Sequence, residues 1–137
     1  KAEEGRAQQM LSQLYFYYMD HVDELPQEYL NFLDAGEKVR GYEVDRRLKE
    51  RFEQLGCAQY LMHRTGHNIG HRCHGIGANL DDYETHDDRC LLPGTMFSIE
   101  PGLYTDKYGV RLEYDVHITS EGETKVYGPV QDEILVI

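Results

Sequence analysis

The chain has 137 residues, 40% of them hydrophobic and 28% charged, and a mean hydropathy of −0.64, as expected for one folded domain rather than a disordered or membrane-spanning chain. Fourteen basic against 25 acidic residues give a net charge of −11, which disfavours nucleic acid as a partner because phosphate binding needs a basic patch. No apolar run approaches membrane-spanning length and the N-terminus has no basic-then-apolar signal, so we expect no membrane association. The chain has three cysteines, Cys57, Cys73 and Cys90, and no CxxC pair. This odd number favours reduced thiols in a cytoplasmic protein over a disulfide framework.

Apolar residues at helical spacing predict helices in the first part of the chain. Residues 2–22 form the first helix, which is apolar or aromatic almost all round near its end. Pro26 favours the start of a second helical turn, which Gly36 would end. The third helix, residues 42–55, carries an apolar stripe and stops at Gly56.

Residues 58–62 form a predicted strand that leads into a cluster of histidines. Four of the seven histidines lie within twelve residues: His63, His67, His71 and His74. An imidazole titrates near neutrality and binds borderline metals, so this density indicates metal ligation or proton transfer. Gly66 and Gly70 allow the backbone to pass close to an ion or a substrate. The alternative is a solvated loop with adventitious metal affinity.

Two alternating segments predict a β-hairpin with acidic side chains on its polar face. Residues 97–100 end on Glu100, and residues 110–119 place Glu113 inside the next strand. If the polar faces coincide, the two glutamates and His67 could offer one nitrogen and two carboxylates to a divalent ion. The alternative is an ordinary hairpin with a solvated outer face.

The remaining segments complete an α+β fold with two or three helices packed on one face of a mainly antiparallel, curved sheet. Residues 75–89 form a polar loop, and residues 120–123 form a turn into a strand at 124–127. Residues 134–137 form a last buried strand. We find no linker or repeat and therefore expect residues 1–137 to form a single domain.

Three ordered motifs resemble the second half of the pita-bread metallopeptidases, a family that includes methionine aminopeptidase, aminopeptidase P and prolidase. The motifs are residues 65–70 with His74, residues 92–104, and residues 109–113. His63 and Arg111 resemble positions typical of the proline-directed members. Residues 40–45 resemble the helix start of bacterial Xaa-Pro peptidase-like proteins, and the likeness runs from about residue 35 to the end of the chain.

The resemblance implies a hydrolase that cleaves the N-terminal bond of short or proline-containing peptides through metal-activated water. It assigns three residues as ligands of manganese, cobalt, iron or zinc: His67, Glu100 and Glu113. Glu100 would also take a proton from the attacking water, and His63 and His74 would stabilise the substrate and the tetrahedral intermediate. Arg111 would support Glu113 or the substrate carboxylate.

The chain departs from the family in its upstream part. Family members bind two metals through five residues, and the first two are aspartates in Asp-x-Gly and Tyr-x-x-Asp-x-Thr-Arg contexts, neither of which occurs in this sequence. We therefore expect a C-terminal portion of the catalytic domain, inactive alone and able to hold at most one ion. Such a portion would expose apolar surface and an open sheet edge, which favours a homodimer.

Two other classes of protein remain open. A catalytically silent pita-bread domain that binds another protein would explain the missing aspartates. A binding module has no need for three ligands on converging strands, however. A cupin-like metal barrel would explain the clustered histidines and the turn after Pro93, but it would require another histidine soon after that turn, and residues 97–104 contain none.

Overall fold

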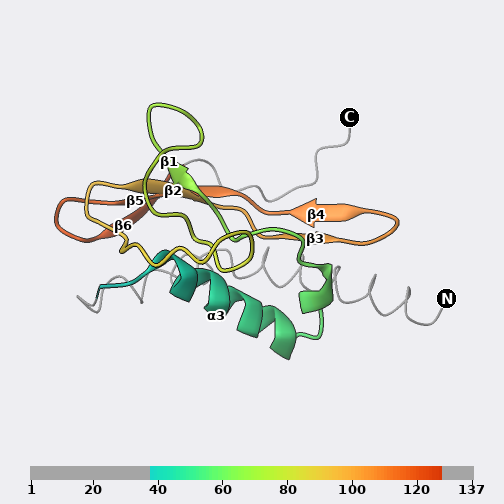
Figure 1. Cartoon of the computed structure of the whole chain (residues 1–137). Coiled ribbons are helices and arrows are strands. Elements are labelled where there is room, and N and C mark those ends of the chain that lie inside the picture. Colours follow the sequence, from blue (N-terminus) through green and yellow to red (C-terminus); the bar gives the residue numbers. More distant parts are fainter. Residues whose placement is uncertain (1–37, 128–137) are drawn as a thin grey trace, which may run out of the picture.

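The computed structural model describes residues 38–127, in which one helix lies beside two antiparallel sheets (Figure 1). Helix α3 (Gly41–Gln54) precedes a short 3-10 helix, η1 (Ala58–Tyr60). The strands are β1 (Asn68–Ile69), β2 (Met96–Ile99), β3 (Gly102–Tyr104), β4 (Gly109–Arg111), β5 (Tyr114–Ile118) and β6 (Thr124–Tyr127). The prediction of an α+β fold is confirmed. The helices predicted before residue 38 and the strand predicted at 134–137 lie outside the described residues.

Helix α3 confirms the third predicted helix and its stop. It begins where the Glu43 carboxylate accepts a hydrogen bond from the Arg40 backbone N–H at 2.7 Å, which satisfies one free donor at the helix start. It ends at Gln54, and the C-cap residue Leu55 is followed by Gly56, whose φ of 70° lies in the left-handed region that glycine tolerates. The buried hydrophobic side chains of the helix are Val44, Leu48 and Phe52.

Residues 58–62 do not form the predicted strand. The backbone N–H of Tyr60 donates to the Cys57 carbonyl at 3.0 Å, and that of Leu61 donates to Ala58 at 3.1 Å, which makes a 3-10 turn. Only Leu61 pairs with a strand, through an isolated bridge to Leu103. A short apolar run does not distinguish a strand from a buried turn, and here the chain must reverse directly after the helix.

The strands from Met96 to Ile118 form one hairpin with a constant register. Strand β2 pairs with β5 and β3 pairs with β4 in the same antiparallel register, and the Leu112 N–H donates to the Pro101 carbonyl between them at 3.3 Å. The predicted continuous strand at 110–119 is therefore interrupted at Leu112 and Glu113. Proline has no N–H for the ladder, so the pairing is weakened opposite Pro101.

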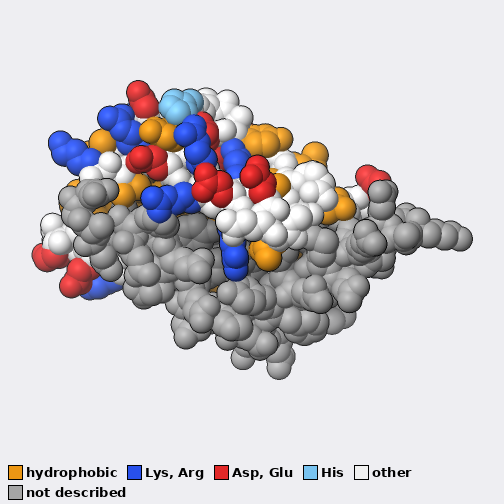
Figure 2. Space-filling model, turned by 90° about the horizontal axis from the view of Figure 1, so that it is seen from below, with side chains coloured by type: hydrophobic (Ala, Val, Ile, Leu, Met, Phe, Trp, Pro, Cys, Tyr) orange, Lys and Arg blue, Asp and Glu red, His pale blue; other side chains and the backbone are white. Residues whose placement is uncertain are grey.

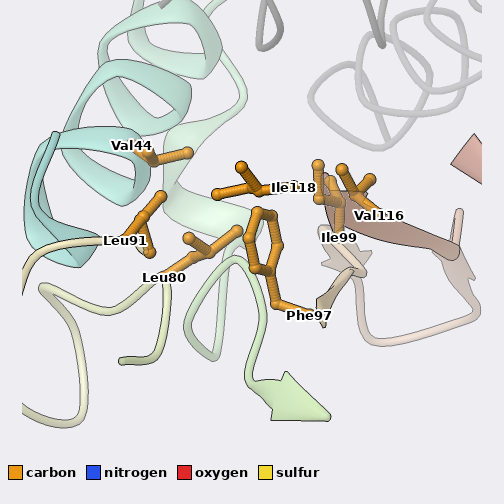
Figure 3. Packing of buried hydrophobic residues seen from close by; sticks show 7 residues of the cluster. All are labelled: Val44, Leu80, Leu91, Phe97, Ile99, Val116 and Ile118. Carbon is orange, nitrogen blue, oxygen red and sulfur yellow. The ribbon is translucent and has the colours of Figure 1, made fainter. Parts of the chain in front are cut away.

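Two hydrophobic clusters attach the helix to the strands. Figure 3 shows the larger cluster, in which the Val44 side chain of α3 packs with residues of β2, β5 and the loops: Leu80, Leu91, Phe97, Ile99, Val116 and Ile118. The smaller cluster joins the second half of α3 to β3: Leu48, Phe52, Cys57, Leu61 and Leu103. These contacts fix the position of β2, which lies between β1 and β5.

Opposite charges are interspersed on the face shown in Figure 2, where basic side chains lie beside acidic ones. Arg46 contacts Asp82 at 2.9 Å, and Lys49 contacts the buried Asp45 at 2.7 Å. Within residues 38–127, no helix is long and apolar enough to cross a membrane.

Candidate metal centre

The register of the central strand brings three predicted site residues to one face. The Ser98 N–H donates to the His67 carbonyl at 2.9 Å, and the Glu100 N–H donates to the Thr65 carbonyl at 2.7 Å, so the segment before β1 continues the pairing with β2. Extending the β2–β5 register by one residue beyond Ile99 places Glu113 opposite Glu100. Because opposite residues of antiparallel strands point to the same face, these side chains lie on one face of the sheet.

His67 is buried, with 5% of its surface exposed, and its ring is held between two oxygen atoms. Nδ1 lies 3.1 Å from the Asn68 carbonyl, which can only accept a hydrogen bond, so the proton of a neutral ring resides on Nδ1. Nε2 then carries the lone pair and lies 3.3 Å from Oε1 of Glu100. Two acceptors at this distance repel each other unless a proton or a cation lies between them.

Ser98 orients both His67 and Glu100 through hydrogen bonds. Its hydroxyl accepts a hydrogen bond from the His67 backbone N–H at 3.0 Å and donates to Oε1 of Glu100 at 3.1 Å. The serine side chain is buried at 1% exposure, so this bridge is shielded from water. The sequence analysis did not assign a role to Ser98, although its place in the alternating segment 97–100 puts it on the polar face.

Arg111 joins the two glutamates. Its guanidinium lies 3.5 Å from Oε2 of Glu100 and 3.0 Å from Oε2 of Glu113. Partial burial acts against the charged guanidinium, but the attraction of Glu113 and Glu100 with the Tyr104 contact outweighs it and raises the pKa of Arg111 above its ordinary value. The Glu100 side chain is 14% exposed and that of Glu113 is 45% exposed, so the site opens to solvent on the Glu113 side.

His63 contacts this group through Tyr104, a residue that the sequence analysis did not identify. Nδ1 of His63 lies 2.7 Å from the Arg64 carbonyl, so Nε2 is free to accept a hydrogen bond from the Tyr104 hydroxyl at 2.9 Å. The tyrosine ring folds back over Gly102, where a Cβ atom would approach the hydroxyl to 2.5 Å. The absence of a side chain at Gly102 leaves room for this ring, which contacts both His63 and Arg111.

His74 packs edge-on against His67, with ring centroids 4.1 Å apart and ring planes at 82°. It is exposed, in the loop that follows β1. The six predicted site residues therefore lie in one chain of contacts: His63, His67, His74, Glu100, Arg111 and Glu113.

Asp45 connects helix α3 to the histidine strand. Its Oδ1 accepts hydrogen bonds from the backbone N–H and the hydroxyl of Thr65, at 2.9 and 2.6 Å, and its Oδ2 accepts one from the Asp82 N–H at 2.6 Å. Lys49 lies 2.7 Å from the same carboxylate, which is 1% exposed. Since Thr65 in turn accepts the Glu100 N–H, Asp45 fixes both strands of the centre.

The donor types on this face suit a divalent ion. The free lone pair of His67 faces the Glu100 carboxylate, and a second carboxylate lies opposite in the register. One nitrogen and two carboxylates suit manganese, cobalt, iron or zinc. A cation bound between Nε2 of His67 and the Glu100 carboxylate would relieve the repulsion between these two acceptors.

The fold of the described residues can be compared with known proteins. Residues 18–120 match the family described as metallopeptidase family M24. The chain belongs to this family. A solved structure titled Xaa-Pro dipeptidase, from Bacillus anthracis, has the pita-bread fold and superimposes with a TM-score of 0.60 and 29% identity over 73% of this chain and 27% of that chain.

Curated relatives are peptidases. The chain is 36% identical over 90 residues to a protein named probable dipeptidase PepE from Mycobacterium bovis, covering 64% of this chain and 23% of that protein. It is 32% identical over 85 residues to the Xaa-Pro dipeptidase of Pyrococcus furiosus, covering 61% of this chain and 23% of the relative. The chain thus spans about a quarter of the length of the curated relatives it matches.

Proposed function

We propose that this chain supplies His67, Glu100 and Glu113 to the divalent-metal centre of an Xaa-Pro dipeptidase or aminopeptidase that acts on peptides. The observation that supports this proposal best is the buried lone pair of His67 facing Glu100 at 3.3 Å. The Xaa-Pro specificity rests on the name of the Pyrococcus furiosus relative and on the His63 and Arg111 positions. Manganese is the ion that we propose first among the candidates.

A divalent ion in this position would supply Lewis acidity, which polarises a peptide carbonyl and acidifies water. Glu100 would accept the proton of the attacking water, because its carboxylate is held by Ser98 and Arg111 at the edge of the buried pair. Arg111 would hold both glutamates in place through its guanidinium. His74 is exposed beside His67 and is free to donate to a developing oxyanion, while Tyr104 holds His63 for contact with the substrate.

The test is calorimetric titration of the purified chain with Mn²⁺. We expect one ion per chain. We expect Glu100→Gln and Glu113→Gln to weaken binding at least tenfold, because each removes the negative charge of a ligand while keeping the size of the side chain. The matched control is Glu53→Gln, on the exposed side of α3. Equal affinity of the wild-type chain and both site variants would refute the centre. Because the sequence has three of the five ligands that the family resemblance implies, we expect negligible hydrolysis of an Xaa-Pro dipeptide by the chain alone.

A second candidate is a catalytically silent domain that binds another protein. The Arg111 guanidinium lies against both glutamates, so the carboxylates have a cationic partner without any ion. If this candidate holds, the titration gives no Mn²⁺ binding, and Glu100→Gln lowers the stability of the chain without changing its response to metal.

A further inference from the structure

A second group of potential metal ligands combines His67 with side chains of the loop that follows β1 and includes neither glutamate. The loop that follows β1 projects away from α3 (Figure 1), and it carries Cys73 and His74, both exposed. One ligand atom from each of Cys73, His74 and His67 lies within 4.8 Å of the other two. No family motif in the sequence analysis includes Cys73.

The base of this loop is clamped beside His67. The Gly75 N–H donates to the Asn68 carbonyl at 2.7 Å, and the Gly77 N–H donates to Oδ1 of Asn68 at 3.0 Å. A Cβ atom on Gly75 or Gly77 would approach the Asn68 side chain to 2.1 or 2.6 Å, so the backbone closes over Asn68 only because both residues are glycine. The proximity of Cys73 and His74 to His67 therefore follows from the anchored base of the loop.

The donor set differs in kind from the carboxylate centre. A thiolate and two imidazoles suit zinc and other thiophilic ions, whereas manganese prefers oxygen ligands. Tetrahedral zinc with bonds of about 2.0 to 2.3 Å separates its ligand atoms by about 3.5 Å. Two of the three side chains are exposed, so they can close the remaining gap by rotation about side-chain bonds.

The geometry points to a thiophilic cation site formed by His67, Cys73 and His74 that shares His67 with the carboxylate centre. We propose that Zn²⁺ at this site and Mn²⁺ at the glutamates exclude each other. Nδ1 of His67 donates to Asn68, so Nε2 provides the single lone pair for which the two ions compete. The existence of the thiolate site stands on its own ligand cluster, and only the exclusion rests on the function proposed above.

The first experiment titrates the chain with Cd²⁺, a spectroscopic probe for zinc sites, and follows the ultraviolet charge-transfer band of a cadmium–thiolate bond. We expect the band to saturate at one Cd²⁺ per chain, to be absent in Cys73→Ser and to be strongly weakened in His74→Ala. Cys90→Ser is the matched control, because Cys90 lies outside the cluster and is partly buried. A band that persists in Cys73→Ser, or the absence of any band in the wild-type chain, would overturn the site.

The second experiment tests exclusion through the electron paramagnetic resonance signal of free Mn²⁺. We expect one equivalent of Zn²⁺ to release bound Mn²⁺ from the wild-type chain, and Cys73→Ser to require at least tenfold more Zn²⁺. Glu100→Gln should weaken Mn²⁺ binding at least tenfold and keep the cadmium band, which separates this site from the carboxylate centre. Simultaneous binding of both ions would refute the shared ligand. A cadmium band in a chain without Mn²⁺ affinity would uphold the thiolate site and refute the exclusion together with the proposed function.

Discussion

At Asp87 the structure places a buried carboxylate against the guanidinium of Arg89, with Nε of the arginine 2.8 Å from Oδ1. The Asn79 N–H donates to the other oxygen at 2.8 Å. The hydrogen bonds from Arg89 outweigh the effect of burial and lower the pKa of Asp87 from 3.8 to about 2. A lowered carboxyl pKa contributes stability above its unfolded value of about 4, and this contribution is lost as the pH falls through about 2.

We therefore expect Asp87→Asn to reduce the free energy of unfolding at pH 7 by about 2 kcal/mol, and to remove part of the pH dependence between pH 4 and pH 2. Urea unfolding of the wild-type chain and the variant at pH 7 and pH 3 measures both effects. Asp88→Asn is the control, because Asp88 is exposed. Parallel loss of stability toward pH 2 in the wild type and in Asp87→Asn would contradict the assignment.

Individual site residues were predictable from the sequence only where a strand pattern or a family motif carried them. Alternation placed Glu100 and Glu113 on one face, and the observed register brings them opposite each other. The structural role of Asp45 was not predicted, although an acidic residue beside the apolar stripe of a helix suggests a buried carboxylate with a hydrogen-bond partner. The role of Tyr104 could not be predicted, because it depends on the side-chain conformation that packs the tyrosine ring against Gly102.

At the scale of elements, close packing between strand backbones limits substitution at Gly66. A Cβ atom there would approach the Ser98 carbonyl oxygen to 1.9 Å, and that atom belongs to the backbone of β2. Gly70 has room, with its nearest neighbour at 3.5 Å. The first glycine is therefore required by a contact between elements, while the second is not.

We expect Gly66→Ala to destabilise the chain by about 3 kcal/mol or more, because strand separation must increase to admit a methyl group. Gly70→Ala should change stability by less than about 1 kcal/mol. Thermal unfolding followed by circular dichroism compares the two variants directly. A Gly66→Ala chain as stable as Gly70→Ala would show that the two segments do not approach this closely.

The elements themselves were predicted unevenly for physical reasons. Helix α3 has both a capping carboxylate and a terminal glycine, which are local signals. The turn at Ala58–Tyr60 has neither signal, and a short apolar run is compatible with a strand or with a turn. The interruption opposite Pro101 could be predicted only once the strand register was known, because the register decides which residue faces the proline.

For the whole molecule, the expected homodimer remains a prediction. Strand β6 ends the order β1-β2-β5-β6 of the described sheet, and Tyr127 is 52% exposed there. The apolar and aromatic end of the first predicted helix, residues 2–22, lies outside the described residues. Charge repulsion is screened within about 8 Å at physiological salt, whereas apolar burial stabilises by roughly 25 cal/mol per Å². Light scattering across dilutions should therefore show dimers, and a monomer at every concentration would reject this expectation.

The constant register of the hairpin also has a kinetic consequence. Its two strands are neighbours in the sequence, so they can pair in about 1 to 10 μs. His67 is separated from them by the polar loop and must make a longer-range contact. The carboxylates should thus meet before the imidazole joins them, which places completion of the ion site after the folding transition state. Mn²⁺ should then slow unfolding in stopped-flow experiments and leave the refolding rate unchanged. Acceleration of refolding by Mn²⁺ would instead mean that His67 is already in place at the barrier, and that the site takes part in nucleating the fold.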